Sequence, residues 1–131
     1  MPNNQVEIPT PFQVFNMEDD RGNLTVLEFS NLRIKPKRLF WVKNLPEGVM
    51  RGNHFHKVCN QVLICIEGKI SVKFTLPDGT QTSYLLEKNI GIDLPTNHLV
   101  QYEFKSPDSS LLVIADQPYD PSDVFTKDDW N

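Results

Sequence analysis

The 131-residue sequence lacks several features that would assign it to a specialised class of protein. No apolar run approaches the ~20 residues that a membrane-spanning helix needs, and no charged-then-apolar leader opens the chain. Basic residues are not in excess, because 17 Asp and Glu outnumber 13 Lys and Arg, for a formal net charge of -4. A general nucleic-acid binder is usually basic, so we expect neither a nucleic-acid nor a membrane partner. A local group of arginines could still bind an anionic small molecule.

Cysteine is scarce as well. Only Cys59 and Cys65 occur, and six steps along one extended strand would separate them by roughly 20 Å, beyond the reach of a disulfide. We therefore expect two free thiols that pack as small apolar side chains, in a protein of the reducing cytoplasm.

Helical periodicity is almost absent, whereas ten prolines and six glycines divide the chain into short segments that alternate apolar and polar residues. The clearest segment alternates from Ile70 to Leu76 and ends at the turn signal Pro77-Asp78-Gly79. We also expect Glu67-Gly68 to close a hairpin between the segments on either side of it. The predicted strands are residues 24–29, 38–43, 61–66, 69–75, 80–86, 91–94, 99–104 and 111–115.

With the segment that carries His54 and His56, these make about nine short strands without intervening helices, which predict an all-β sandwich or barrel. Asp120 as a helix N-cap, with Pro121 at the first helical position, predicts a short C-terminal helix or turn. With no internal repeat or linker, residues 1–131 are expected to form one domain.

The residues that can carry chemistry concentrate around His54 and His56. Side chains at i and i+2 of a strand project from the same face, with backbones roughly 6 to 7 Å apart, so this spacing aims two imidazoles at one ligand. Taken alone, such a pair is also compatible with surface histidines or with satisfied histidines of the core.

The surrounding spacing resembles the first motif of the cupins: Gly48, five residues, His54-x-His56, four residues, Gln61, six residues, Gly68. This resemblance implies an all-β, RmlC-like jelly-roll barrel. Gln61 stands where many cupins have a glutamate metal ligand, and glutamine offers only a neutral oxygen. His98 could complete a three-histidine site if it faced inward, but we expect a site without metal or other cofactor, since imidazoles transfer protons near neutral pH unaided.

A narrower resemblance runs from about residue 12 to 125, to the sugar 3,4-ketoisomerases of the WxcM-like cupins. It rests on four segments, which are Asp20-Arg21-Gly22-Asn23-Leu24, Arg51-Gly52-Asn53-His54-Phe55-His56-Lys57, Gln61-Val62-Leu63-Ile64-Cys65 and Ala115-Asp116-Gln117-Pro118-Tyr119-Asp120-Pro121-Ser122-Asp123. The family implies an isomerase that moves a ketone from C4 to C3 of a dTDP-linked 6-deoxyhexose through an enediol, supplying deoxy-amino sugars for surface glycans such as lipopolysaccharide. It also implies a homodimer with exchanged N-terminal strands.

The resemblance implies roles for individual residues. His54 and His56 are the expected catalytic pair, in an order that the sequence leaves open, and Arg21 and Arg51 are expected to bind the diphosphate. The remaining candidate substrate-binding residues are Trp41, Asn53, Gln61, His98 and Tyr102. A second basic group, Lys35, Lys37 and Arg38, is interpreted as a solvated strand edge, with contact to the phosphate as the alternative.

Two departures from the family affect the site. Relatives have tyrosines in the strand before the histidines, whereas this chain has Leu39-Phe40-Trp41-Val42; Trp41 could stack on the thymine or belong to the core. Relatives also have a Trp-His pair near Pro95, whereas His98 is displaced here by one residue and could face the other way. Tyr102 and Gln101 are possible substitutes. Two alternatives stay open: a 3,5-epimerase of the same sugars, and a catalytically silent sugar-binding cupin.

Overall fold

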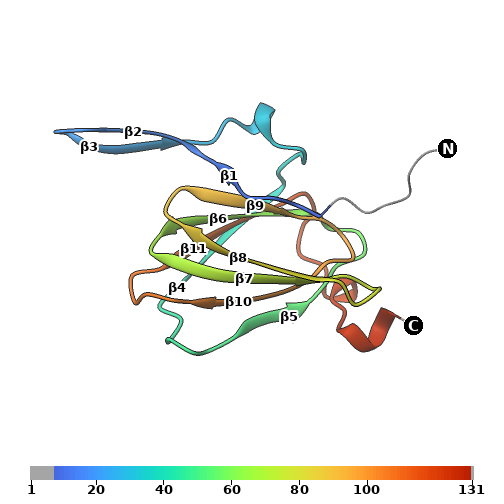
Figure 1. Ribbon diagram of the computed structural model, residues 1–131. Helices are drawn as coiled ribbons and strands as arrows, with labels where there is room; N and C mark the ends of the chain where they lie inside the picture. Colours follow the sequence, from blue (N-terminus) through green and yellow to red (C-terminus); the bar gives the residue numbers. More distant parts are fainter. Residues whose placement is uncertain (1–7, 131) are drawn as a thin grey trace.

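The computed structural model describes residues 8–130, and within them eleven strands form two antiparallel sheets and a separate hairpin (Figure 1). The five-stranded sheet has the order β1 (Phe12–Gln13), β9 (Ile90–Leu94), β6 (Gln61–Glu67), β11 (Ser110–Ala115) and β4 (Arg38–Lys43). The four-stranded sheet has the order β5 (Arg51–His54), β10 (Leu99–Phe104), β7 (Lys69–Thr75) and β8 (Gln81–Glu87). The predicted all-β architecture is confirmed. No helix in this part of the chain is long and apolar enough to cross a membrane.

The two sheets face each other across the main core. Ile70, Val72 and Phe74 alternate along β7 with half-exposed residues and are fully buried, as the alternation in the sequence predicts. β6 is buried on both faces, because its inner side chains join the main core while Val62 and Ile64 pack into a second cluster on the outer side of the sheet. The five-stranded sheet is therefore covered by apolar side chains on both of its faces at β6.

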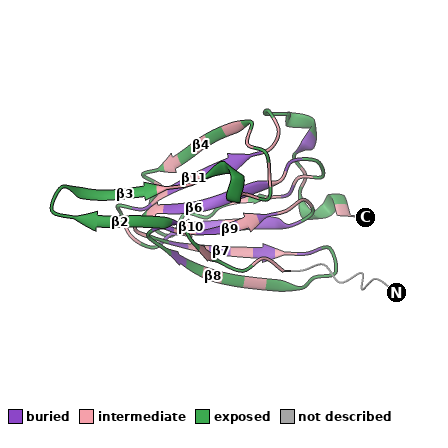
Figure 2. Ribbon diagram, turned by 90° about the horizontal axis from the view of Figure 1, so that it is seen from above, coloured by how far each residue is buried: buried purple, intermediate pink, exposed green. Residues whose placement is uncertain are grey.

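The N-terminal part of the chain lies outside the barrel. β2 (Phe15–Asp19) and β3 (Gly22–Val26) form a hairpin that projects from the sheets, and its residues are almost entirely exposed (Figures 1 and 2). The strand predicted over residues 24–29 is therefore misplaced, because β3 starts at Gly22, ends at Val26 and is followed by a 3-10 turn, η1 (Phe29–Asn31). After this turn, Leu32 and Ile34 pack on the outer cluster of the five-stranded sheet.

The hairpin predicted around Gly68 is also wrong. β6 pairs with β9 and β11, whereas β7 pairs with β8 and β10, so the chain passes from one sheet to the other at Gly68. Gly68 has φ +80°, and a Cβ there would lie 2.4 Å from the Ser109 hydroxyl, so only glycine fits this crossing. The turn at Pro77-Asp78-Gly79 does join paired strands, β7 and β8, as predicted.

The C-terminal segment closes over one end of the barrel as two 3-10 turns, η2 (Pro121–Asp123) and η3 (Lys127–Trp130). Asp120 caps η2 by accepting a hydrogen bond from the Ser122 N–H, which confirms the predicted start signal. Phe125 then forms a two-way main-chain bridge with Phe55, whose ring stacks on those of Phe125 and Trp130. This bridge connects the C-terminal segment to Phe55, the residue between His54 and His56.

Candidate active site

A cavity of about 330 Å³ opens between the sheets at the end that the C-terminal segment covers. This volume lies within the range of small-molecule sites, about 300–1,000 Å³. The chemistry-bearing side chains that line it are Arg38, Arg51, His54, His56, Cys59, Gln61, Tyr102, Tyr119, Asp120 and Asp123. They come from both sheets and from the C-terminal segment.

A bulge in β5 brings Arg51 and His54 to the same cavity. Residues three apart in a regular strand point to opposite faces, but Gly52 (φ +92°) and Asn53 (φ +63°) are both left-handed, and the register with β10 shifts there. His54 consequently stands opposite Val100, and Arg51 opposite Tyr102. A Cβ at Gly52 would lie 2.7 Å from the Val100 carbonyl oxygen, so glycine is required for the bulge.

The two imidazoles of the histidine pair face each other inside the cavity. Their ring centroids are 5.2 Å apart, with the rings nearly perpendicular. Burial lowers the pKa of His54 below its ordinary value, and the positive charges of a protonated His56 and of Arg51 lower it further, against a main-chain hydrogen bond with Gly52. His54 is therefore a neutral imidazole at pH 7 and can accept a proton.

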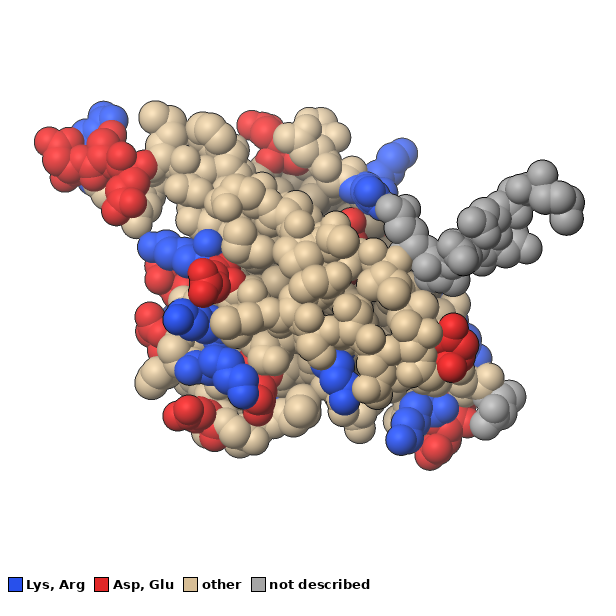
Figure 3. Space-filling model, viewed as in Figure 1, with Lys and Arg blue, Asp and Glu red and all other residues tan. Residues whose placement is uncertain are grey.

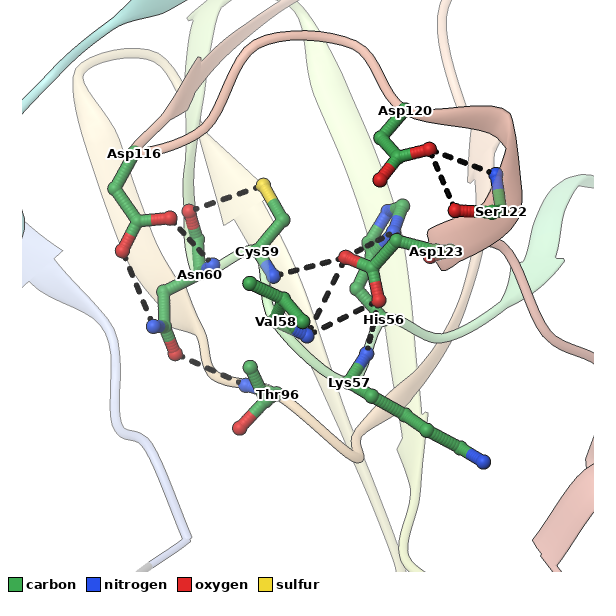
Figure 4. Close-up of polar contacts among 10 residues, drawn as sticks. All are labelled: His56, Lys57, Val58, Cys59, Asn60, Thr96, Asp116, Asp120, Ser122 and Asp123. Atoms are coloured by element: carbon green, nitrogen blue, oxygen red, sulfur yellow. Dashed lines mark hydrogen bonds and ion pairs between the residues drawn. The ribbon is translucent and has the colours of Figure 1, made fainter.

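His56 is oriented by Asp123 from the C-terminal segment (Figure 4). Its Nδ1 lies 2.5 Å from the main-chain carbonyl oxygen of Asp123 and 3.7 Å from the carboxylate. Because a carbonyl oxygen only accepts, Nδ1 carries the hydrogen in the neutral ring and Nε2 is left as the acceptor. This arrangement resembles the way in which a base is held in one tautomer by a third group.

The buried Asp123 carboxylate also shapes the loop after the histidines. It accepts hydrogen bonds from the N–H groups of Lys57 at 2.8 Å, Val58 at 3.1 Å and Cys59 at 3.0 Å (Figure 4). The Asp116 carboxylate likewise accepts hydrogen bonds from the N–H and the side-chain amide of the next residue, Asn60. The loop that leads from the histidines to β6 is therefore fixed by two aspartates of the C-terminal segment.

Two arginines stand at the cavity. Arg51 comes from β5, and Arg38 from β4, where its guanidinium lies 4.7 Å from the centre of the Phe40 ring and 5.3 Å from that of Tyr119. Arg38 thus lines the cavity and is not the solvated strand edge that the sequence suggested. An arginine held between two rings presents its donors in a fixed direction, which suits binding of an anion.

Four of the predicted binding residues lie outside the cavity. Trp41 is 64% exposed on the outer face of β4, because Arg38 and Phe40 occupy the inner positions of that strand. Asn53 points away at the bulge and accepts a hydrogen bond from the Gln101 side chain. His98 is only 3% exposed, and its Nδ1–H donates to the Thr96 carbonyl at 2.9 Å. The prediction that Trp41 stacks on the base is therefore not supported by its position.

Arg21 is the fourth predicted binding residue outside the cavity, and it lies at the tip of the projecting hairpin, between β2 and β3. It is 86% exposed and pairs with Asp19 at 2.7 Å, within a group of charged, mostly acidic side chains that Figure 3 shows at upper left. The hydrogen bonds from Arg21 lower the pKa of the Asp19 carboxyl. In its own chain, Arg21 does not line the cavity.

The cysteines behave as expected. Both are buried and free, and burial raises the pKa of Cys59 and raises that of Cys65 to about 12. Both are therefore protonated at neutral pH and poor nucleophiles, although Cys59 lines the cavity. Within residues 8–130, no three His, Cys, Asp or Glu side chains are grouped as metal ligands.

Tyr119 and Asp123 were not singled out as site residues from the sequence, and phosphate contact by the group that contains Arg38 was given only as an alternative. Arg38 could have been found from the parity of β4, since it shares a face with Phe40 and Val42. The segment that holds Tyr119 and Asp123 was noticed only as part of a resemblance, because nothing in the sequence reports a contact across 67 positions, such as the one between Asp123 and His56.

Comparison with known proteins agrees with this architecture. Residues 9–130 match the family model described as "FdtA: WxcM-like, C-terminal". A curated relative from Aneurinibacillus thermoaerophilus, TDP-4-oxo-6-deoxy-alpha-D-glucose-3,4-oxoisomerase, is 29% identical over 114 residues, which cover 85% of this chain and 81% of the relative.

The chain also has the same fold as several solved 3,4-ketoisomerase structures. A variant of the 3,4-ketoisomerase QdtA from Thermoanaerobacterium thermosaccharolyticum, in complex with TDP-4-keto-6-deoxyglucose, matches with a TM-score of 0.87 at 22% identity, over 96% of this chain and 93% of that one. A 3,4-ketoisomerase from Helicobacter canadensis matches at 0.85 and 25% identity, over 93% of each chain. The rmlC epimerase of Mycobacterium tuberculosis matches at 0.79 and 16% identity, over 96% of this chain and 72% of that one. The predicted jelly-roll fold is confirmed.

Proposed function

The chain belongs to the FdtA family of WxcM-like, C-terminal domains, and from this premise we propose that it is a 3,4-ketoisomerase of a dTDP-linked 4-keto-6-deoxyhexose. The observation that carries the proposal is the pair of imidazoles, 5.2 Å apart, in one cavity between the sheets. A curated relative is named as a 3,4-oxoisomerase of a TDP-linked 4-oxo-6-deoxyglucose, which supports the same activity. In the cell, the product would supply deoxy-amino sugars for surface glycans from the cytoplasm.

In the proposed reaction, a neutral imidazole removes the C3 proton, which the neighbouring C4 ketone makes acidic. The C3–H electron pair forms a C3=C4 double bond, and the C4 oxygen takes up a proton to give the enediol. Return of a proton to C4 and loss of the O3 proton leave the ketone at C3, so the reaction consumes no proton overall. The low pKa of His54 and the free Nε2 of His56 make both rings suitable bases.

The experiment that tests this proposal is incubation with dTDP-4-keto-6-deoxyglucose in deuterated water, followed by proton NMR. Deuterium at C3 together with a 3-keto product supports the isomerase. Deuterium at C3 and C5 without migration of the ketone would instead identify a 3,5-epimerase. Binding without exchange at any carbon would leave a silent sugar-binding protein.

We propose that Arg38 and Arg51 bind the diphosphate. Replacing Arg38 by Ala removes a charge-assisted contact worth about 1.5–3 kcal/mol, so the Kd for thymidine diphosphate should rise about 10- to 100-fold. The matched control is Lys37→Ala, which removes an exposed positive charge one residue away. Titration calorimetry measures both variants, and equal affinities for Arg38→Ala and the wild type would remove Arg38 from the binding site.

We propose further that the protein is a homodimer in which the hairpin of each chain packs on the other. Phe15, Met17 and Leu24 of the hairpin and Trp41 of the edge strand β4 are each at least 55% exposed, and a partner chain that covered them would remove this apolar area from water. Arg21, at the hairpin tip, would then lie on the partner. Light scattering should give twice the chain mass, and Met17→Lys combined with Trp41→Lys should give the monomer. A wild-type monomer at micromolar concentration would contradict the proposal.

A further inference from the structure

In the proposed reaction the ketone oxygen at C4 needs a proton donor. A tyrosine hydroxyl in the cavity could supply this proton. Two tyrosines line the cavity within the described residues, Tyr102 of β10 and Tyr119 of the C-terminal segment. Tyr119 is 67% exposed and packs on the Arg38 guanidinium, whereas Tyr102 is 7% exposed. The strand β4 contributes Phe40 to the cavity, a ring without a hydroxyl group. A donor shielded from water is therefore offered by Tyr102.

The position of Tyr102 is fixed by the register of β5 and β10. Tyr102 stands opposite Arg51, and Val100, two residues earlier on the same face of β10, stands opposite His54. Side chains on such a diagonal lie roughly 7 to 8 Å apart at the backbone. The phenol and the imidazole of His54 therefore come from adjacent strands and line the same cavity.

Arg51 is the charged neighbour of the phenol on the adjacent strand. It stands opposite Tyr102 in the register of β5 and β10, and a guanidinium has donors but no acceptor. A hydrogen bond between the two side chains can only run from Arg51 to the phenol oxygen, so it leaves the phenol O–H available to a different acceptor. The positive charge also stabilises the phenolate that would remain after proton transfer.

Resting on the proposed isomerase function, we infer that Tyr102 is the catalytic acid, donating its proton to the C4 oxygen as the enediol forms. The tyrosinate then takes the proton of the O3 hydroxyl as the ketone forms at C3 and the imidazolium returns its proton to C4. Because O3 and O4 are on adjacent carbons, one phenol can serve both. Protons and electrons balance, and Tyr102 and the histidine end as they began.

The protonation state of Tyr102 agrees with this role. Burial raises the pKa of the phenol above its ordinary value, while the neighbouring Arg51 opposes the shift. The phenol is consequently protonated throughout the neutral range, as a proton donor must be.

The decisive variant is Tyr102→Phe, which removes one oxygen from the cavity. Loss of a single donor to a developing oxyanion costs about 10²- to 10³-fold in kcat. We expect kcat to fall by about 100-fold with KM nearly unchanged, and the rate of deuterium exchange at C3 to fall in parallel. The matched control is Tyr84→Phe on β8, a partly buried tyrosine that packs on the core outside the cavity and should leave kcat as it is.

A second variant keeps the ring and its hydroxyl. Replacing Tyr102 by a fluorinated tyrosine, whose phenol is more acidic, should move the basic limb of the kcat–pH profile to lower pH. An active wild type with an unaltered kcat in Tyr102→Phe, or with an unshifted basic limb in the fluorinated protein, would overturn the role of Tyr102 alone. An inactive wild type would instead overturn the proposed function.

Discussion

Replacing His54 by Asn is expected to abolish both the migration of the ketone and the exchange of deuterium at C3, with a loss of about 10²- to 10⁴-fold, the range for a removed general base. The effect should be large because burial holds this imidazole neutral at pH 7, and asparagine has no nitrogen lone pair to accept a proton. His56→Asn is expected to have a similar effect. Its amide can still donate to the Asp123 carbonyl from near the Nδ1 position, but the acceptor at Nε2 is gone.

His98→Asn is the matched control for both substitutions. His98 lies outside the cavity, and an asparagine amide can replace its Nδ1–H in the hydrogen bond to Thr96. This variant should keep its activity. Wild-type exchange rates in both His54→Asn and His56→Asn would remove the pair from the mechanism.

The pH profile gives a second measurement on His54. A base must be unprotonated, so the rate falls as pH decreases through its pKa. Because burial lowers the pKa of His54, the acidic limb of kcat/KM should lie below about pH 6.5, the ordinary value for histidine. An acidic limb above that value in a stable wild-type protein would argue against His54 as the titrating base.

Replacing Asp123 by Ala is expected to cause the largest loss of stability. The substitution leaves the N–H groups of Lys57, Val58 and Cys59 without their acceptor, and Cys59 is buried. A buried donor left unsatisfied costs about 1–3 kcal/mol, so we expect the free energy of unfolding to fall by about that amount for the Cys59 N–H alone. Urea denaturation should show a lower midpoint with an unchanged slope.

Asp120→Ala is the matched control for Asp123. The two aspartates lie three residues apart, but Asp120 is exposed and caps only the short turn η2. Its removal should lower the midpoint much less. A similar decrease in both variants would show that the carboxylate of Asp123 has no special place in the loop.

A second substitution, Asp123→Asn, separates a role of Asp123 in catalysis from its role in stability. Asp123→Asn keeps an oxygen that can accept from the loop, but it removes the negative charge 3.7 Å from Nδ1 of His56. If that charge stabilises the imidazolium, kcat should fall in protein that is fully folded by circular dichroism, while KM changes little. An unchanged kcat would restrict Asp123 to a structural role.

Much of the fold could be predicted because strand alternation is a local property. The segment from Ile70 to Leu76 shows one buried and one polar face in the sequence, and β7 has that arrangement. In β4 the same reasoning was ambiguous, since Arg38, Phe40 and Val42 form one face and Leu39, Trp41 and Lys43 the other, and both faces carry apolar residues. Trp41 entered the candidate site through the resemblance, either to stack on the base or to belong to the core, and Arg38 was interpreted mainly as a solvated edge; in the structure Arg38 lines the cavity and Trp41 is exposed outside it.

The parts of the site that escaped prediction depend on contacts between distant residues. The left-handed pair Gly52 and Asn53 shifts the register against β10 and turns Arg51 toward the cavity, which a regular strand would not do. The crossing at Gly68 looked like a hairpin because a glycine serves either purpose. Asp123 lies 67 positions from His56, and only the folded chain brings the two together.

The most direct measurement is carbon-13 NMR of dTDP-4-keto-6-deoxyglucose labelled at C3 and C4, recorded while the wild-type protein acts on it. We predict that the ketone resonance is transferred from C4 to C3, at a rate that His54→Asn and His56→Asn both suppress. A ketone that stays at C4 throughout, in a sample where the protein binds the sugar nucleotide, would contradict the assignment of this cavity to an isomerase.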